Sequence, residues 1–359
     1  MKFDITAGQL AKPLMMAAGA SEAKSTLPVL ANVLLQADDG RLSITGSNME
    51  TELCVTAPAD IHDAGSVTIN AQKFAALVKK IPDSSAMRFQ LDDDKLIIRA
   101  GRSRFSLATI PADIFPAFPS HETKARIDID ADAILGLIDR TANAMGNNDV
   151  RHYLNGLYVE LIGGVLRAVA SDGYRLSLSE CPVDGEDMPG VILPRRAVLQ
   201  MAKLLTGTVS LSVSASTAMM HFEGIRFGTK LVEGRFPDYQ RVMPLEIGTT
   251  ITVDRKAMIE TLNRVNVLAE NQAAKLELDG NQLRISSVNQ LNESATESMD
   301  VMVDGKLSLI AFNIKYLLDA LNKIDAEQAS IGITPDGSAA LLSAPDDKSV
   351  RHIVMPMRV

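Results

Sequence analysis

The chain has 359 residues, more than a single hydrophobic core usually supports, so two or three domains are expected. Apolar residues make up 46% and charged residues 22%, as in soluble proteins that bury their cores. The two cysteines are far apart and exclude a disulfide scaffold, and no apolar stretch has the length of a signal peptide or a membrane span. We therefore expect a cytoplasmic protein without a membrane partner. The net charge of −8 argues against a nucleic-acid partner only if the charge is evenly spread.

A strand that runs into a helix recurs three times along the chain. The pattern starts at Phe3, Ile127 and Ile251, at two equal intervals. In each copy the apolar spacing changes from period two to period 3.6 at the same place, where a helix N-cap is expected. These expected caps are Thr6, Asp130 and Asp254. A turn with a strand follows at 40–48, 164–172 and 281–289, and a second strand-to-helix switch follows at 67–81, 191–205 and 310–324.

The strands of each copy mostly alternate apolar and polar residues, which favours antiparallel sheets with one covered face. The sequence therefore predicts an α+β protein made of three tandem repeats of a two-helix, antiparallel-sheet domain. The expected domains are 1–122, 123–247 and 248–359. Repeats that stack head to tail without capping units can close into a ring.

Basic residues outnumber acidic ones in the six expected helical stretches, so the rest of the chain is more acidic than its net charge suggests. These stretches are 7–24, 71–82, 131–146, 194–205, 254–270 and 313–325. A single helix can carry such charge simply because that face is solvated. A bias over the whole set favours helices that line one positively charged hole, which suits a phosphate backbone without base readout.

Motifs for catalysis, cofactors and metals are not found. The chain has no phosphate-binding glycine loop and no nucleophile elbow, and its histidines have no metal-ligand spacing. Asp92, Asp93 and Asp94 fit a hairpin turn better than a metal site, and Ser171 precedes an Asp-Gly turn without a base beside it. We expect no catalytic residue, no metal and no cofactor.

Several long segments resemble the bacterial sliding clamps, the β subunits of DNA polymerase III, and the resemblance covers the whole chain. The segments are TLPVLANVLL (26–35), GRSRFSLATIP (101–111), DVRHYLNGL (149–157), SDGYRL (171–176), KLVEGRFPDYQRVMP (230–244) and IVMPMRV (353–359). The resemblance implies the DNA clamp fold and a ring-shaped homodimer with helices lining the hole. It implies a non-catalytic processivity factor that encircles double-stranded DNA without sequence preference. The implied partners are the polymerase III α subunit, the clamp loader δ subunit, and other polymerases and repair proteins with clamp-binding peptides.

The resemblance also implies three sets of site residues. A hydrophobic pocket for partner peptides would comprise Leu154, Ser171, Gly173, Tyr174, Arg175, Leu176, Pro237, Val242 and Met355, with a shallower groove of Arg151, Tyr153, Pro356 and Met357. DNA would be contacted by Lys24, Asn148, Arg151, His152, Tyr153, Arg195 and Arg196. At the dimer interface Phe105 and Leu107 would pack on Val267 and Leu268, and Lys73, Arg99, Arg102 and Arg104 would face Glu293, Glu297 and Asp300.

Two other functions remain open at this point. A repeat-built adaptor could bind peptides without encircling DNA, and an acidic outer surface would suit it equally. An enzyme with a site dispersed over the repeats would require a cluster of perturbed titratable residues in a cleft.

Overall fold

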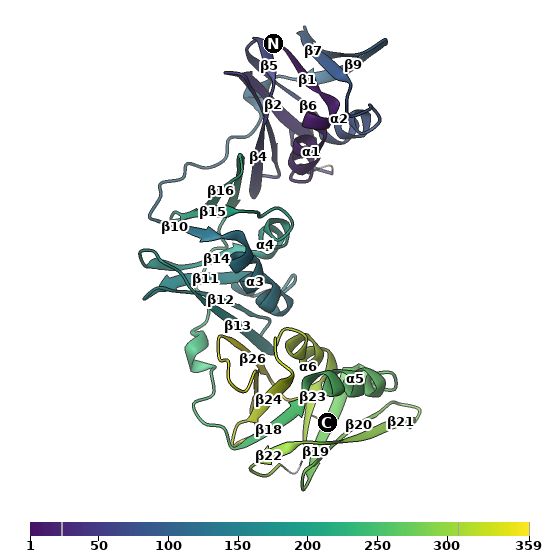
Figure 1. Ribbon diagram of the computed structural model, residues 1–359, viewed down its shortest axis with the longest axis vertical. Helices are drawn as coiled ribbons and strands as arrows, with labels where there is room; N and C mark the ends of the chain where they lie inside the picture. The colour runs from purple at the N-terminus through teal and green to yellow at the C-terminus, as the bar shows by residue number, and fades with distance from the viewer. Residues whose placement is uncertain (23, 308, 359) are drawn as a thin grey trace. The chain divides into compact units, whose positions relative to one another are not determined.

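The computed structural model describes residues 1–22, 24–307 and 309–358. Ala23 and Val359, which belong to segments named above, lie outside the described residues. The chain folds as two compact units, residues 1–131 with 204–231, and residues 132–203 with 232–359. Figure 1 shows the helices and strands of each.

The three sequence repeats each fold into two helices and a set of strands. The first contains β1 (Lys2–Thr6), α1 (Ala7–Ala18), β2 (Asn32–Asp38), β3 (Arg41–Ser47), β4 (Thr51–Pro58), β5 (Asp60–Asp63), β6 (Gly65–Asn70), α2 (Ala71–Val78), β7 (Ala86–Asp92), β8 (Lys95–Ala100) and β9 (Ser103–Ile110). The second contains β10 (Ala125–Asp130), α3 (Ala131–Thr141), β11 (Gly156–Ile162), β12 (Val165–Ser171), β13 (Arg175–Pro182), β14 (Met188–Pro194), α4 (Arg195–Met201), β15 (Thr208–Val213), β16 (Thr217–Phe222) and β17 (Ile225–Lys230). The third contains β18 (Thr249–Asp254), α5 (Arg255–Asn266), β19 (Ala273–Asp279), β20 (Gln282–Val288), β21 (Ser294–Asp300), β22 (Met302–Asp304), β23 (Ile310–Asn313), α6 (Ile314–Leu321), β24 (Gln328–Ile333), β25 (Ala340–Ser343) and β26 (Val350–Val354).

The helices start where the sequence predicts. Thr6 caps α1 and forms a capping box with Gln9, and the Asp254 carboxylate accepts a hydrogen bond from the Ala257 N–H at 2.8 Å. The predicted ends were wrong, because the helices are shorter than the stretches counted above. Lys24 and Lys203 lie beyond the ends of their helices. Basic residues still outnumber acidic ones within the six helices themselves.

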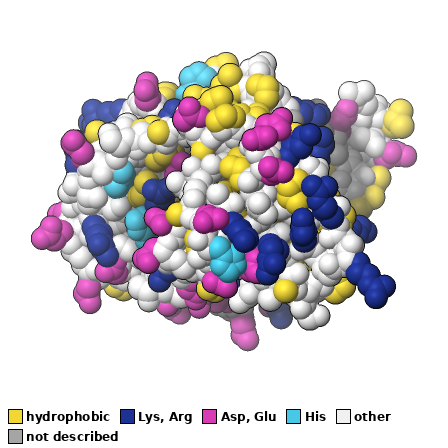
Figure 2. All heavy atoms as spheres, turned by 90° about the horizontal axis from the view of Figure 1, so that it is seen from above, with side chains coloured by type: hydrophobic (Ala, Val, Ile, Leu, Met, Phe, Trp, Pro, Cys, Tyr) yellow, Lys and Arg dark blue, Asp and Glu magenta, His cyan; other side chains and the backbone are white. Residues whose placement is uncertain are grey.

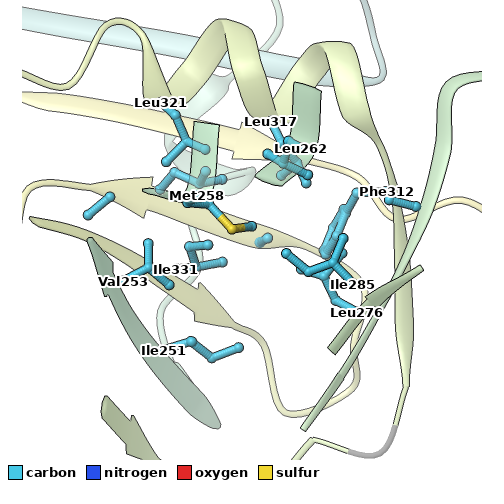
Figure 3. Packing of buried hydrophobic residues seen from close by; sticks show 14 of the residues in the cluster. Ile251, Val253, Met258, Leu262, Leu276, Ile285, Phe312, Leu317, Leu321 and Ile331 are labelled. Atoms are coloured by element: carbon cyan, nitrogen blue, oxygen red, sulfur yellow. The ribbon is translucent and has the colours of Figure 1, made fainter. Parts of the chain in front are cut away.

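The cores lie between the helices and one face of the strands, as predicted, and they are mostly aliphatic, although the rings of Phe3, Phe74 and Phe89 pack together in the first repeat. In the third repeat, Met258 on α5 and Leu317 on α6 pack over Ile251, Ile331 and their neighbours on the strands (Figure 3). All of these side chains are fully buried. The same arrangement in the first repeat forms a core of its own.

The sheets continue from one repeat into the next. Every strand pair among the described residues is antiparallel, and β17 of the second repeat pairs with β4 of the first, from Ile225 opposite Val55 to Thr229 opposite Thr51. In the other unit, β26 of the third repeat pairs with β13 of the second. Backbone hydrogen bonds therefore join neighbouring repeats.

The predicted turns are confirmed. The aspartate run at 92–94 connects β7 to β8, and Asp93 has a φ of 47°. Ser171 ends β12 and the following turn leads into β13.

Among the described residues, no group of three or more His, Cys, Asp or Glu side chains is placed to hold a metal ion. No helix in the described ranges is long and apolar enough to cross a membrane.

Candidate partner-binding pocket and interface surfaces

A cavity of about 160 Å³ lies in the second unit, where four segments of the chain meet. These are the loop before β11, the turn between β12 and β13, the irregular segment after β17, and the chain end after β26. Its lining residues are Arg151, Tyr153, Leu154, Ser171, Gly173, Arg175, Leu176, Phe236, Pro237, Tyr239, Val242, Ile353 and Met355. Most of this lining is apolar, so the cavity is suited to hydrophobic side chains.

Most of the predicted pocket residues meet at this cavity. Tyr174, Pro356 and Met357 are the predicted residues that do not line it. The Tyr174 side chain is 64% exposed, while its backbone carbonyl accepts a hydrogen bond from the Met355 N–H at 2.9 Å. The Met357 N–H donates to the Ala311 carbonyl at 2.7 Å, which fixes the chain end beside β23.

Three lining residues were missed from the sequence: Phe236, Tyr239 and Ile353. Phe236 and Tyr239 belong to an irregular segment, where residue spacing does not indicate which side chains are buried. Ile353 lies on β26, and its alternation predicts a buried side chain but not the cavity beside it. All three are less than a tenth exposed.

The turn between β12 and β13 requires a glycine at position 173. Gly173 has a φ of 87°, and a Cβ atom there would lie 2.6 Å from Nη1 of Arg151. The Ser171 hydroxyl accepts a hydrogen bond from the Gly173 N–H at 3.1 Å and donates to the Arg175 carbonyl at 2.8 Å. Ser171 therefore shapes the pocket turn, and its hydroxyl is used within the fold.

The guanidinium group of Arg175 is held within the protein. Its Nε donates to Asp172 at 3.0 Å, its Nη1 donates to Asp319 at 2.5 Å, and the group lies 4.3 Å from the ring centroid of Tyr316. The side chain is 10% exposed. Because its donors already have acceptors, Arg175 acts as a fixed part of the pocket wall, and its charge is not free to bind a ligand.

Arg151 forms the polar rim of the pocket. It donates to Asp149 at 2.8 Å and to the Asp172 carbonyl at 3.0 Å. Hydrogen bonds from the Arg151 side chain and backbone lower the pKa of Asp149 to about 2. The loop is therefore ordered by an ion pair on the pocket side.

The residues predicted to contact DNA lie in both units. Lys24 is exposed after α1, in the first unit. In the second unit, His152 and Arg196 are exposed, and Asn148 has a φ of 57°. Arg195 is half-buried, and its Nη1 donates to the Met145 carbonyl at 3.0 Å, so it also supports the segment after α3.

The predicted interface residues of the first repeat lie on and around β9. Phe105 and Leu107 pack against the first core, and Arg102 and Arg104 are exposed. Arg99 lines a small polar hollow on β8 together with Lys2 and Arg88. Lys73 is exposed on α2.

The predicted interface residues of the third repeat lie at the end of α5 and on β21. Val267 is 79% exposed and Leu268 is half-buried. Glu297 is paired with Arg264 at 2.7 Å, and this ion pair lowers the pKa of Glu297. The Glu293 carboxylate accepts a hydrogen bond from Asn289 at 2.6 Å, and Asp300 accepts one from Gln282 at 3.4 Å.

Comparison with known proteins finds one family over the whole chain. Models of the DNA polymerase III beta subunit match in three parts: the N-terminal domain at residues 1–119, the central domain at 128–238 and the C-terminal domain at 240–358. The beta sliding clamp of Vibrio cholerae is 34% identical, with 100% of both chains covered. The crystal structure of the DNA polymerase III subunit beta from Pseudomonas aeruginosa is 36% identical and has a TM-score of 0.96 over 100% of both chains. A Pseudomonas aeruginosa sliding clamp bound to griselimycin is 35% identical, with a TM-score of 0.95 over 100% of both chains.

Three joined repeats with an apolar pocket near the chain end, matched over the whole length by these relatives, place the chain in the class of the sliding clamps. The chain belongs to the DNA polymerase III beta subunit family, the sliding clamps that act as processivity factors of bacterial DNA polymerases.

Proposed function

We propose that this clamp works as a closed ring of two copies around double-stranded DNA, in the cytoplasm and without catalysis of its own. Its domains would be 1–122, 123–247 and 248–359. The pocket would tether the polymerase III α subunit, the clamp loader δ subunit, and other polymerases and repair proteins that carry clamp-binding peptides. A ring held by topology raises the local concentration of its bound polymerase at the primer end without tight DNA contacts.

The strand pairing between repeats carries this proposal. The last strand of each repeat pairs with the fourth strand of the repeat before it: β17 pairs with β4, and β26 pairs with β13. Two strands then have no partner of this kind in the chain: β9, the last strand of the first repeat, and β21, the fourth strand of the third repeat. If the rule continued between two copies, these two strands would pair with each other. A head-to-tail interface of this kind closes a ring when the rotation permits.

Both of these strands have an open edge within the described chain. β21 is the edge strand of a four-stranded sheet and pairs with β20 alone. β9 pairs fully with β8, whereas only Thr109 and Ile110 at its end pair with β6. Exposed edges pair readily with other strands, so the two edges supply complementary surfaces for a second copy.

The existing junctions also predict the register between copies. By the matching hairpins, Ser103 corresponds to Ile225 and Glu297 corresponds to Val55. Because Ile225 lies opposite Val55, Ser103 of one copy would lie opposite Glu297 of the other. This register places Phe105 opposite Ala295, and each of them packs against the core of its own repeat. Inward-facing residues thus meet inward-facing residues, as a continuous sheet requires.

The cationic residues suit a phosphate backbone. Basic residues outnumber acidic ones in the helices although the protein carries a net charge of −8. We assign the DNA contacts to the predicted residues Lys24, Asn148, Arg151, His152, Tyr153, Arg195 and Arg196. Few strong contacts to DNA are needed, because each additional phosphate that the clamp neutralises increases its affinity for DNA, and tight DNA binding would slow sliding.

An apolar pocket at the chain end suits short peptides from several partners. Met355 is 44% exposed at its mouth, and a methionine side chain adapts to different ligands. The solved Pseudomonas aeruginosa clamp bound to griselimycin shows that a relative takes a ligand. A peptide-binding adaptor that does not encircle DNA would share this pocket, but the open edges of β9 and β21 favour the ring.

Removal of the chain from Met355 onward tests the pocket. The shortened protein loses the Met355 lining and the hydrogen bond from Met357 to Ala311, so its binding to the polymerase III α subunit should fall below detection. Its sedimentation as a dimer should be unchanged, because β9 and β21 are intact. Arg358→Ala, at an exposed position outside the pocket, is the matched control. Unchanged polymerase binding by the shortened protein would contradict the pocket assignment.

A further inference from the structure

One wall of the pocket is formed by residues 232–243, a segment that belongs to no strand. It follows the end of β17 and contains a single short 3-10 helix, Tyr239–Arg241. Its side chains Phe236, Pro237, Tyr239 and Val242 line the cavity. Its backbone is tied to β14 at Val232, whose N–H donates to the Ile192 carbonyl at 2.9 Å, but it lacks the hydrogen-bonded ladder of a sheet, so side-chain contacts also fix its position.

Glu160, on β11, provides such a contact. The residue is 6% exposed, and each of its carboxylate oxygens accepts a hydrogen bond from a tyrosine hydroxyl. Tyr239 donates to Oε1 at 2.6 Å, and Tyr158 donates to Oε2 at 2.7 Å. Hydrogen bonds to a charged acceptor are among the stronger ones in proteins. We name this set of three residues, Glu160, Tyr158 and Tyr239, the carboxylate clasp.

The carboxylate clasp reaches the pocket by two routes. Tyr239 lines the cavity itself. Tyr158 does not line it, but its ring stacks on Phe236 with the centroids 5.0 Å apart, and Phe236 does line it. Gly190 makes room for Tyr158, because a Cβ atom at position 190 would lie 1.9 Å from the tyrosine oxygen.

Both tyrosines keep their protons at neutral pH. Burial and the hydrogen bond to Glu160 raise the pKa of Tyr239 to about 12, and the same two causes raise the pKa of Tyr158. Each hydroxyl therefore remains a donor to the carboxylate throughout the physiological range.

We propose that Glu160 is a positioning residue for partner binding, which holds the 232–243 wall in the shape that admits a partner peptide. The inference rests on the proposed function of the pocket and adds a buried residue that does not itself line it. When a binding-competent wall is only partly populated, the apparent affinity falls by that fraction. Loss of a hydrogen bond to Glu160 therefore weakens binding without removing any side chain from the pocket lining.

Titration calorimetry of the full-length dimer with griselimycin as the probe tests this role. We expect Tyr158→Phe and Glu160→Leu each to weaken binding about tenfold, the effect of a lost hydrogen bond to a charged group. Glu160→Gln should remain within about threefold of the unchanged protein, because an amide accepts from one hydroxyl and can donate to the other. A site that needs only a filled volume would tolerate Glu160→Leu as well as Glu160→Gln, so weakened binding by Glu160→Leu alone supports the hydrogen-bonding role.

Glu52 supplies the matched control. It is also 6% exposed, lies in the other unit and accepts a hydrogen bond from Arg226 at 2.8 Å. Glu52→Gln should leave griselimycin binding unchanged, and thermal unfolding of each variant separates stability from affinity. If Glu160→Leu does not fold, Tyr158→Phe decides alone, since it removes one hydroxyl.

Val242→Asp separates the failure of this inference from failure of the pocket itself. Unchanged binding by Tyr158→Phe and Glu160→Leu, with binding lost in Val242→Asp, would overturn the role of Glu160 and leave the pocket in place. Unchanged binding by Val242→Asp as well would overturn the pocket assignment and the role of Glu160 together.

Discussion

His352 lies on β26, in the middle of the pairing that joins the third repeat to the second. It is opposite Ser177 of β13, and its Nδ1 is 2.8 Å from the Ser177 hydroxyl. The residue is 1% exposed, and its Nε2 has no hydrogen-bond partner among the described residues. Burial, together with the nearby charges of Arg175 and Lys323, lowers the pKa of His352 to about 4.

This histidine should make the clamp less stable in mild acid. Its folded-state pKa is below the unfolded value, so its contribution to stability is present above about pH 6.5 and is lost as pH falls toward 4. By linkage, the loss at pH 5 relative to pH 7.5 is about 2 kcal/mol. His352→Gln should show a smaller loss over this range in urea unfolding. An identical pH dependence in the two proteins would contradict the assignment.

At the residue scale, the sequence predicted side chains that stand in distinctive motifs. Leu154, Ser171 and Leu176 fall in segments that resemble the family, and all line the pocket. Tyr239 also falls in such a segment, but it was not predicted as a pocket residue, because its position depends on a hydrogen bond to Glu160, 79 positions away in the sequence. Arg195 was predicted as a DNA contact, but the sequence did not indicate its hydrogen bond to the Met145 carbonyl, because the two residues are far apart in the chain.

At the scale of elements, helix starts were predictable because caps are local. Thr6 and Asp254 bind backbone donors within three residues. Helix ends depend on which turns find tertiary packing, and this explains why Lys24 lies outside α1. The pairing of β17 with β4 is a contact between residues more than a hundred positions apart, and alternation alone does not indicate it.

The strand-pairing rule can be tested by cross-linking β9 to β21. In the inferred register Arg104 of one copy lies opposite Thr296 of the other, and both side chains are exposed in the single chain. With Cys54 and Cys181 replaced by serine, the pair Arg104→Cys and Thr296→Cys should form a covalent dimer on oxidation. Denaturing electrophoresis would show it.

The matched control moves one cysteine along the same strand. Arg104→Cys with Asp300→Cys keeps the strands and the exposure, but places the two sulfurs too far apart for a bond in this register. Equal cross-linking of the two pairs, or none with either, would mean that the register between copies is different.

At the scale of the whole molecule, the acidic composition and the proposed DNA partner are compatible because the charge is unevenly distributed. Figure 2 shows several lysine and arginine side chains close together on the right of the face that it displays, with a few others at its left and acidic side chains over much of the face. The repeat is therefore a better guide to the function than the net charge. It predicts which helices share an environment and which strands are left for a second copy.

Retention on circular DNA tests the ring most directly. Clamps loaded on a nicked circle should stay bound during gel filtration at moderate salt, in a complex containing twice the 38.6 kDa chain. Cutting that circle once should release them, because a sliding ring leaves at a free end. Phe105→Arg, which breaks the proposed interface, should be retained on neither form. Equal loss of the unchanged clamp from circular and linear DNA would contradict the encircling ring.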